Sequence, residues 1–103
     1  MKKNKGPADT YKKAKLVLRL YVSGMSPKSM EAIENIRTLC SSYPEEKYNL
    51  EIIDIYQHPE MASIDHIIFS PSLIKLLPLP KKVLIGTTYN TDRVKSILGL
   101  TTF

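Results

Sequence analysis

Residues 15–30 read KLVLRLYVSGMSPKSM and contain the strongest fold signal in the chain. The segment KLVLRLYV is a nearly continuous apolar run, which predicts a central strand buried on both faces. Gly24 then marks a turn, and Ser26 and Pro27 are the residue types preferred at a helix N-cap and at the first helical position. The stretch therefore predicts a strand, a tight turn and a helix in direct succession.

The residues that follow predict a helix and a second strand. The helix is expected to end before Pro44, because a proline restricts the preceding residue to an extended conformation. Residues 48–55, YNLEIIDI, are rich in β-branched side chains and predict a strand. The crossover between the two strands makes them parallel and right-handed. The predicted buried stripe of the helix consists of Met30, Ile33, Ile36, Leu39 and Cys40.

The second half of the chain predicts a short helix, two more strands and a last helix. The short helix is expected to start at His58 and to end at Asp65 or His66, and the strands to span residues 72–77 and 82–86. The last helix is expected to present one apolar side, formed by Val94, Ile97, Leu98 and Leu100. The resulting order, βαβαββα, is that of a thioredoxin-like α/β fold, a four-stranded sheet with helices on both faces.

The length and the charge distribution indicate one domain with a basic extension. The chain has 103 residues and a net charge of +5, but residues 1–15 hold six lysines and a single acid. Residues 16–103 then hold nine basic and nine acidic residues. We expect residues 1–14 to form a disordered basic arm and residues 15–103 to form the folded domain. The alternative for the arm is binding to an acidic surface, a phosphate or RNA.

The sequence shows no sign of a membrane or nucleic-acid partner in the folded domain. No apolar run approaches the roughly 18–20 residues that span a bilayer, and the N-terminus lacks the apolar region of a secretory signal. Basic and aromatic residues are not interleaved as in RNA-binding modules. We therefore expect a cytoplasmic protein without a nucleic-acid partner.

The junction that thioredoxin-type enzymes use for two cysteines contains no cysteine here. Dithiol chemistry requires a low-pKa thiolate at a helix N-terminus and a second thiol beside it. Residues 25–29 are MSPKS instead, and the single cysteine, Cys40, falls on the apolar stripe near the end of the predicted helix. Cys40 is therefore expected to be a small buried hydrophobe, and redox catalysis is not expected.

Other catalytic and metal-binding patterns are also missing. His58 and His66 are eight residues apart and have no cysteine or third histidine to complete a metal site. Glu51 and Asp54 lie three apart on a predicted strand, which places them on opposite faces. The sequence contains no nucleophile elbow, Walker loop or dinucleotide fingerprint. We expect no enzymatic activity, no metal and no cofactor.

Residues 69–80, FSPSLIKLLPLP, form an unusual proline-rich segment. Ser70-Pro71 precedes a predicted strand, which is where thioredoxin-like folds place a cis peptide bond. Three prolines in ten residues also make a segment slow to rearrange, because each isomerisation takes tens of seconds or longer. The alternative is that these prolines only stiffen turns.

Three stretches closely resemble the KaiB family of circadian clock proteins. They are LRLYVSGMSPKSMEAIENI, YNLEIIDIYQHPEMASIDHIIFSPSLIKLLPLPKKVLIG and TDRVKSILGL, and the resemblance covers residues 16–100. Its most specific parts are LYVSG with the following Ser-Pro, IDI with HPE, and SPSLIKLLPLP.

The resemblance implies a non-enzymatic regulator of the hexameric ATPase KaiC. It also implies two folds. One is a thioredoxin-like monomer that binds the N-terminal ring of KaiC and helps to sequester KaiA, and the other is a tetrameric ground state with a rearranged C-terminal half. A homo-oligomer, either a tetramer or a dimer, is expected on the same basis.

The resemblance also assigns roles to individual residues. The partner-contact candidates are Lys75, Lys81 and Lys82, with Lys28 as a weaker candidate. Pro71 is the expected backbone switch element, and Gly86 is grouped with it as a structural position of the rearranging half. Tyr21 and Asp54 are expected to support the fold.

The sequence departs from the family pattern in three places. Residues 87–90, TTYN, replace a shorter acidic turn, the chain ends in TTF without an acidic tail, and the basic arm is an addition. These differences leave a second interpretation open. The chain could be a KaiB-like adaptor outside a complete clock, for example in stress signalling with a KaiC homologue or a histidine kinase.

Overall fold

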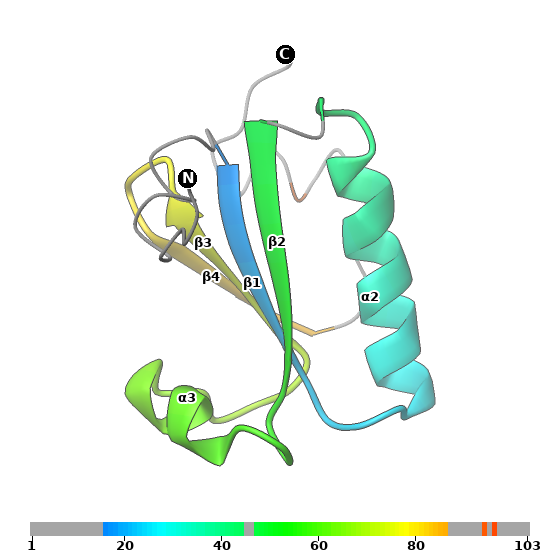
Figure 1. Ribbon diagram of the computed structural model, residues 1–103, viewed down its shortest axis with the longest axis vertical. Coiled ribbons are helices and arrows are strands. Elements are labelled where there is room, and N and C mark those ends of the chain that lie inside the picture. Colours follow the sequence, from blue (N-terminus) through cyan, green and yellow to red (C-terminus); the bar gives the residue numbers. More distant parts are fainter. Residues whose placement is uncertain (1–15, 45–46, 87–93, 95, 97–103) are drawn as a thin grey trace, which may run out of the picture.

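The computed structural model describes residues 16–44, 47–86, 94 and 96. Four strands form one sheet in the order β2-β1-β3-β4. Helix α2 covers one face of the sheet, and the short helix α3 lies against the other (Figure 1). The elements are β1 (Leu16–Val22), α2 (Pro27–Cys40), β2 (Tyr48–Asp54), α3 (Pro59–Ile64), β3 (Ser72–Leu77) and β4 (Lys82–Ile85). The predicted element order is confirmed for this part of the chain.

Strand β1 is the centre of the sheet, as the apolar run predicted. It pairs in parallel with β2, from Leu16 opposite Tyr48 to Val22 opposite Asp54, and antiparallel with β3 on its other edge. All of its residues except Arg19 are buried. A strand that is paired on both edges and covered on both faces needs apolar side chains in both directions, which explains the continuous run.

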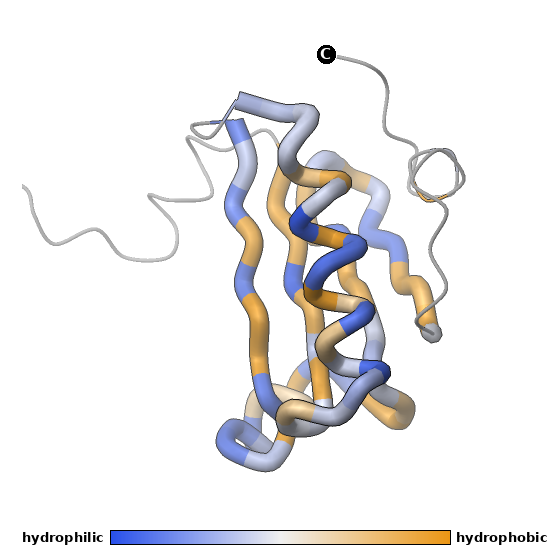
Figure 2. The backbone as a smooth tube through the Cα atoms, turned by 90° about the vertical axis from the view of Figure 1, so that its right-hand side faces the viewer, coloured by the Kyte–Doolittle hydropathy of each residue, from blue (hydrophilic) through white to orange (hydrophobic). Residues whose placement is uncertain are grey.

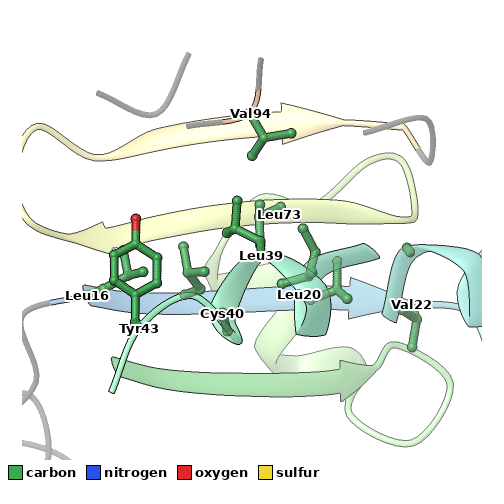
Figure 3. Close-up of a cluster of buried hydrophobic side chains, with 11 residues drawn as sticks. Leu16, Leu20, Val22, Leu39, Cys40, Tyr43, Leu73 and Val94 are labelled. Atoms are coloured by element: carbon green, nitrogen blue, oxygen red, sulfur yellow. The ribbon is translucent and has the colours of Figure 1, made fainter. Parts of the chain in front are cut away.

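The main core lies between α2 and the sheet. Figure 2 shows hydrophobic segments along the strands that lie behind α2, and Figure 3 shows the side chains that meet there. The buried members are Leu16, Leu18, Leu20, Val22, Ala32, Ile36, Leu39, Cys40, Tyr43, Leu73 and Val94. Val94 and Ser96 are helical, in agreement with a last helix, whose other predicted residues lie outside the described part of the chain.

A smaller core lies on the opposite face of the sheet, beside α3. Tyr21, Ile53 and Ile74 form its buried centre. The half-buried side chains packed against them include Met61 and Ala62 of α3. The two helices therefore cover different faces, as predicted.

The start of α2 is as predicted, and its buried stripe departs from the prediction at Met30. Ser26 is the N-cap, and its Oγ accepts a hydrogen bond from the backbone N–H of Ser29 at 3.2 Å. Met30, predicted to be buried, is 44% exposed. The prediction was wrong because Met30 and Leu39 are nine residues apart, which places them about half a turn from each other at 3.6 residues per turn. The buried residues are Ser29, Ala32, Ile36, Leu39 and Cys40.

The C-terminal half has its predicted strands, with small differences at their ends. Strands β2 and β4 each end one residue earlier than predicted. The bond before Pro71 is cis, as the comparison with thioredoxin-like folds predicted, and so are the bonds before Pro78 and Pro80. Gly86 has a φ of 115°, which favours glycine, and its N–H donates to the Pro71 carbonyl at 3.0 Å.

Within the ranges given above, no helix is both long enough and apolar enough to cross a bilayer.

A pair of leucine substitutions tests the placement of the core. Leu73→Ala removes a fully buried side chain between the sheet and α2, and we expect it to lower the free energy of unfolding by about 2–5 kcal/mol. Leu79→Ala is the matched control because Leu79 is 74% exposed, and its effect should be within about 0.5 kcal/mol. Chemical denaturation measures both, and equal effects would contradict the core described here.

Candidate partner-binding surface

Three loops meet at the end of the sheet where β1 and β2 finish. The loop after β1 contacts the segment before β3 through the hydroxyl groups of Ser23 and Ser70. The loop after β2 adjoins the same place, because Val22 and Asp54 are opposite each other at the ends of the two parallel strands. In the sheet, β2 lies beside one edge of β1 and β3 lies beside the other edge, so the loops diverge at the end of β1. Such a point, beyond the carboxyl ends of strands, is where α/β sheets commonly bind ligands.

Asp54 fixes two of these loops to each other. Its Oδ1 accepts hydrogen bonds from the backbone N–H groups of Gly24 and Tyr56, both at 3.0 Å. Gly24 has a φ of 60°, and a Cβ at that position would lie 3.6 Å from the ring of Tyr56. The left-handed backbone explains the glycine, and the carboxylate of Asp54 joins the two loops through these hydrogen bonds.

Large apolar side chains are exposed on these loops. We call Met25, Tyr56, Ile68 and Phe69 the end surface; each of them is between 60% and 83% exposed. Met25 and Tyr56 belong to the two loops that Asp54 joins, and Phe69 adjoins Ser70. Exposed apolar side chains that are gathered in one place commonly mark a protein-binding site.

A charged network lies on the face of the sheet beside α3. Arg19 of β1 contacts Glu51 of β2 at 2.9 Å and the Oδ2 of Asp65 at 2.9 Å. The hydroxyl of Tyr21 also donates to the Oδ2 of Asp65, which is the C-cap residue of α3. The network thus joins two neighbouring strands to the end of the short helix.

Burial and neighbouring charges shift the pKa values of this network. Burial, together with the hydrogen bond to the Asp65 carboxylate and its charge, raises the pKa of Tyr21. Burial also opposes ionisation of Asp65. However, the hydrogen bonds from Tyr21 and Arg19, with the charges of Arg19 and Lys81, outweigh it and hold the pKa of Asp65 below its ordinary value of 3.8.

The four predicted lysines do not form one group. Lys28 is exposed at the start of α2, at the same end of the sheet as the end surface, whereas the exposed Lys81 and Lys82 lie at the start of β4, at the opposite end. Lys75 is only 1% exposed and faces Lys82 across the β3–β4 pair. Burial, and the charge of Lys82, lower the pKa of Lys75. In this conformation Lys75 is not accessible to a partner.

The remaining predicted positions have structural contacts. Pro71 is buried, and its carbonyl accepts the N–H of Gly86, so the start of β3 and the end of β4 are tied together. Tyr21 is fully buried and bonded to Asp65. Asp54 joins the two loops described above.

Sequence reasoning missed both the network and the end surface. The network had one signal in the sequence, the single arginine in the run KLVLRLYV. A charged residue on a buried strand needs an acidic partner, so this arginine predicts a carboxylate beside β1. The three consecutive apolar residues 67–69 before Ser70-Pro71 were a signal for the end surface.

The described residues show no arrangement for metal or thiol chemistry. Between residues 16 and 86, with 45 and 46 excepted, and at 94 and 96, no three histidine, cysteine or acidic side chains are grouped as metal ligands. Cys40 is buried under the C-terminal end of α2, far along the helix from the loop end. Burial raises the pKa of its thiol to about 11.

Comparisons with known proteins identify related chains and folds. The family model described as the KaiB domain matches residues 19–100. The chain is 43% identical to the circadian clock protein KaiB3 of Synechocystis sp., over 84% of this chain and 82% of that protein. It is 36% identical to the circadian clock oscillator protein KaiB of Gloeothece citriformis, over 89% of this chain and 84% of that one.

Solved structures that resemble this one confirm the thioredoxin-like fold. The N-terminal domain of SasA from Synechococcus elongatus superimposes with a TM-score of 0.66 at 21% identity, over 81% of this chain and 78% of that domain. The thioredoxin Deadhead of Drosophila superimposes with a TM-score of 0.68 at 14% identity, over 96% of this chain and 97% of that one. Identities this low demonstrate the fold alone.

The reactivity of Cys40 tests the absence of thiol chemistry. With a thiol pKa of about 11, only about one molecule in a thousand is a thiolate at pH 8. We expect the native protein to react with a disulfide reagent such as DTNB far more slowly than the same protein in guanidinium chloride. Rapid reaction of the native protein would contradict the buried position of Cys40.

The pH dependence of stability tests the Asp65 contacts. A carboxyl group with a lowered folded-state pKa adds stability that is present above its unfolded pKa of about 3.8 and is lost as the pH falls through the folded pKa. Denaturation of the wild type and Asp65→Asn should show a stability difference that is constant above about pH 5 and narrows below about pH 4. Glu60→Gln, which removes an exposed carboxylate of α3, is the control. A difference between wild type and Asp65→Asn that is independent of pH would contradict the contacts.

Proposed function

Because the chain belongs to the KaiB family, we propose that it is a non-enzymatic regulator that binds a KaiC-like hexameric ATPase and modulates its phosphorylation and ATPase cycle. The relatives over most of the chain are circadian clock proteins. The observation that carries the proposal is the end surface, a set of exposed apolar side chains on three adjoining loops, two of which are joined by Asp54. A cytoplasmic location is part of the proposal.

The end surface has the properties of a protein-binding site. Tyr56 and Phe69 are aromatic, and aromatic side chains are enriched among the residues that dominate interface energies. Burial of apolar area contributes roughly 25 cal/mol per Å². The hydrogen bonds from Gly24 and Tyr56 to Asp54 order the two loops that carry Met25 and Tyr56 before a partner arrives, which reduces the entropy lost on binding.

The lysines have separate places in the proposal. Lys28 borders the end surface and would contact an acidic rim of the partner. Lys81 and Lys82 form a second, basic contact region at the other end of the sheet. Lys75 would take part only after a change of conformation exposes it.

A second conformation is also part of the proposal. In the expected tetrameric ground state the C-terminal half is rearranged, and Pro71 and Gly86 are the backbone positions proposed to change. Two states that differ by a few kcal/mol would both be populated, and a partner that binds one of them would shift the balance. Homo-oligomers and a KaiA-like partner belong to the same proposal.

The second candidate function is a KaiB-like adaptor outside a complete clock. The sequence differences favour it, namely the basic residues 1–15 and the turn TTYN at 87–90. Its partner would be a KaiC homologue without a clock, or a histidine kinase. A pull-down that captures a histidine kinase in the absence of KaiC would support this candidate over the first.

Binding measurements with the ATP-loaded KaiC-like ATPase of the same organism test the first candidate. We expect a complex that forms over hours in size-exclusion chromatography. Phe69→Ala should weaken it at least about tenfold, equivalent to about 1.4 kcal/mol, because it removes an aromatic contact. Met30→Ala, which shortens an exposed side chain on α2, is the matched control and should bind normally.

Two results would contradict the proposal. One is the lack of a complex in every phosphorylation state of the ATPase, which removes the proposed function. The other is equal affinity of Phe69→Ala and the wild type for the ATPase, which would show that the end surface is not the binding site.

A further inference from the structure

Helix α3 has little packing of its own to hold it on the sheet. It spans six residues, none of them buried, and its N-cap residue, His58, makes no side-chain capping bond. Only Met61 and Ala62 pack, half-buried, against the small core. A helix this short is not stable by itself in water, because the few hydrogen bonds do not compensate for the ordering of its backbone. Its position therefore depends on additional contacts with the sheet.

Those contacts come from Tyr21 and Arg19 of the central strand. The single hydroxyl proton of Tyr21 has two acceptors in α3 and its C-cap, the Oδ2 of Asp65 and the Met61 carbonyl at 3.1 Å. Arg19 Nη1 donates to the same Oδ2 at 2.9 Å. Two donors on β1 thus converge on one carboxylate oxygen, and charge-assisted bonds of this kind are stronger than neutral ones.

Glu51 balances the network on the other side of Arg19. Its Oε1 accepts from Arg19 Nε at 3.0 Å, and it lies opposite Arg19 in the β1–β2 register. Arg19 therefore keeps one carboxylate partner when Asp65 is changed. Substitution of Asp65 removes the carboxylate that Tyr21 and Arg19 share, and it leaves Arg19 with Glu51 and the Tyr21 hydroxyl with the Met61 carbonyl. The attachment of α3 through Asp65 can therefore be tested separately from the neutralisation of Arg19.

The chain leaves α3 at Asp65 and enters the end surface directly. His66 adopts a φ of 57°, and the N–H of Ile67 returns to the Ala62 carbonyl at 2.8 Å. Ile68 and Phe69 follow, both exposed. The direction in which these two side chains are presented is therefore set at the end of α3.

We propose that Asp65, held by Tyr21 and Arg19, anchors α3 to the sheet and positions Ile68 and Phe69 for a protein partner. The part concerning the partner rests on the proposed function, whereas the anchoring does not. Asp65 is a positioning residue, because it is largely buried and acts through the segment that follows it.

Hydrogen exchange of the full chain tests the anchoring without a partner. In Asp65→Asn and Tyr21→Phe, the Ile67 and Asp65 amides, which are hydrogen-bonded within this segment, should exchange at least about tenfold faster than in the wild type. Amides of β1 and β3 should be unaffected. Glu51→Gln is the matched control, because it weakens the ion pair on the far side of Arg19 and should leave the Ile67 amide slow. Unchanged Ile67 exchange in both variants would overturn the anchoring.

Affinity for the ATP-loaded KaiC-like ATPase tests the positioning. If the segment is ordered in only about a tenth of Asp65→Asn molecules, the apparent Kd should rise about tenfold, because only the ordered fraction binds. By linkage, the bound ATPase should restore slow exchange at Ile67 in that variant. Glu51→Gln should bind like the wild type.

The two experiments together separate failure of the anchoring or positioning role of Asp65 from failure of the proposed function. Faster exchange with wild-type affinity would overturn the positioning role and leave Asp65 as a structural anchor only. A wild-type chain that binds no KaiC-like ATPase would remove the proposed function and with it the positioning role, whereas the exchange measurement would still decide whether Asp65 anchors α3.

Discussion

The central strand β1 is hydrogen-bonded on both edges and covered on both faces, and its one charged residue, Arg19, has to be neutralised within the protein. Transfer of a guanidinium into such surroundings is unfavourable unless carboxylates accept its hydrogen bonds. Glu51 meets this requirement from the neighbouring strand, and Asp65 from the end of α3. The position of Arg19 on β1 therefore determines where α3, which is too short to be stable by itself, is attached to the sheet. It also fixes the start of the loop that carries Ile68 and Phe69.

The sequence was sufficient for the order of the elements because their signals are local. The apolar run of β1, the Ser26-Pro27 helix start and the β-branched residues of β2 each act within a few residues. Met30 was wrongly assigned to the buried stripe of α2 because steps of three residues were treated as one face, although such steps drift around the helix. Ile36, Leu39 and Cys40 of the predicted stripe are buried. Ser29 and Ala32, which are small, are buried in addition to these residues.

The contacts that build the candidate surface could not be derived in the same way. Arg19 and Asp65 are 46 residues apart, and the sequence around either residue does not predict that the other is its partner. Lys75 shows the opposite case, in which a local signal existed. The alternation of side chains along β3 places Lys75 on the same face as the buried Leu73, and so on the face covered by α2. A lysine with buried neighbours two residues away is a poor candidate for a surface contact in this conformation.

Ile68 and Phe69 lie in the chain directly after the last residue of their segment that packs in the small core on the α3 side of the sheet. The small core there is already occupied by Tyr21, Ile53 and Ile74, and by the half-buried Met61, Ala62 and Ile67. Ile67 is the last residue of this segment that packs in that core, and Ile68 and Phe69 after it are exposed. The Asp65 contacts and the Ser70 hydroxyl hold the segment at both ends. An apolar segment that is fixed at both ends loses less conformational entropy when a partner covers it than a free loop would. The fold thus retains the thioredoxin arrangement at this end of the sheet, with apolar side chains available for binding where thioredoxin-type enzymes place their thiols.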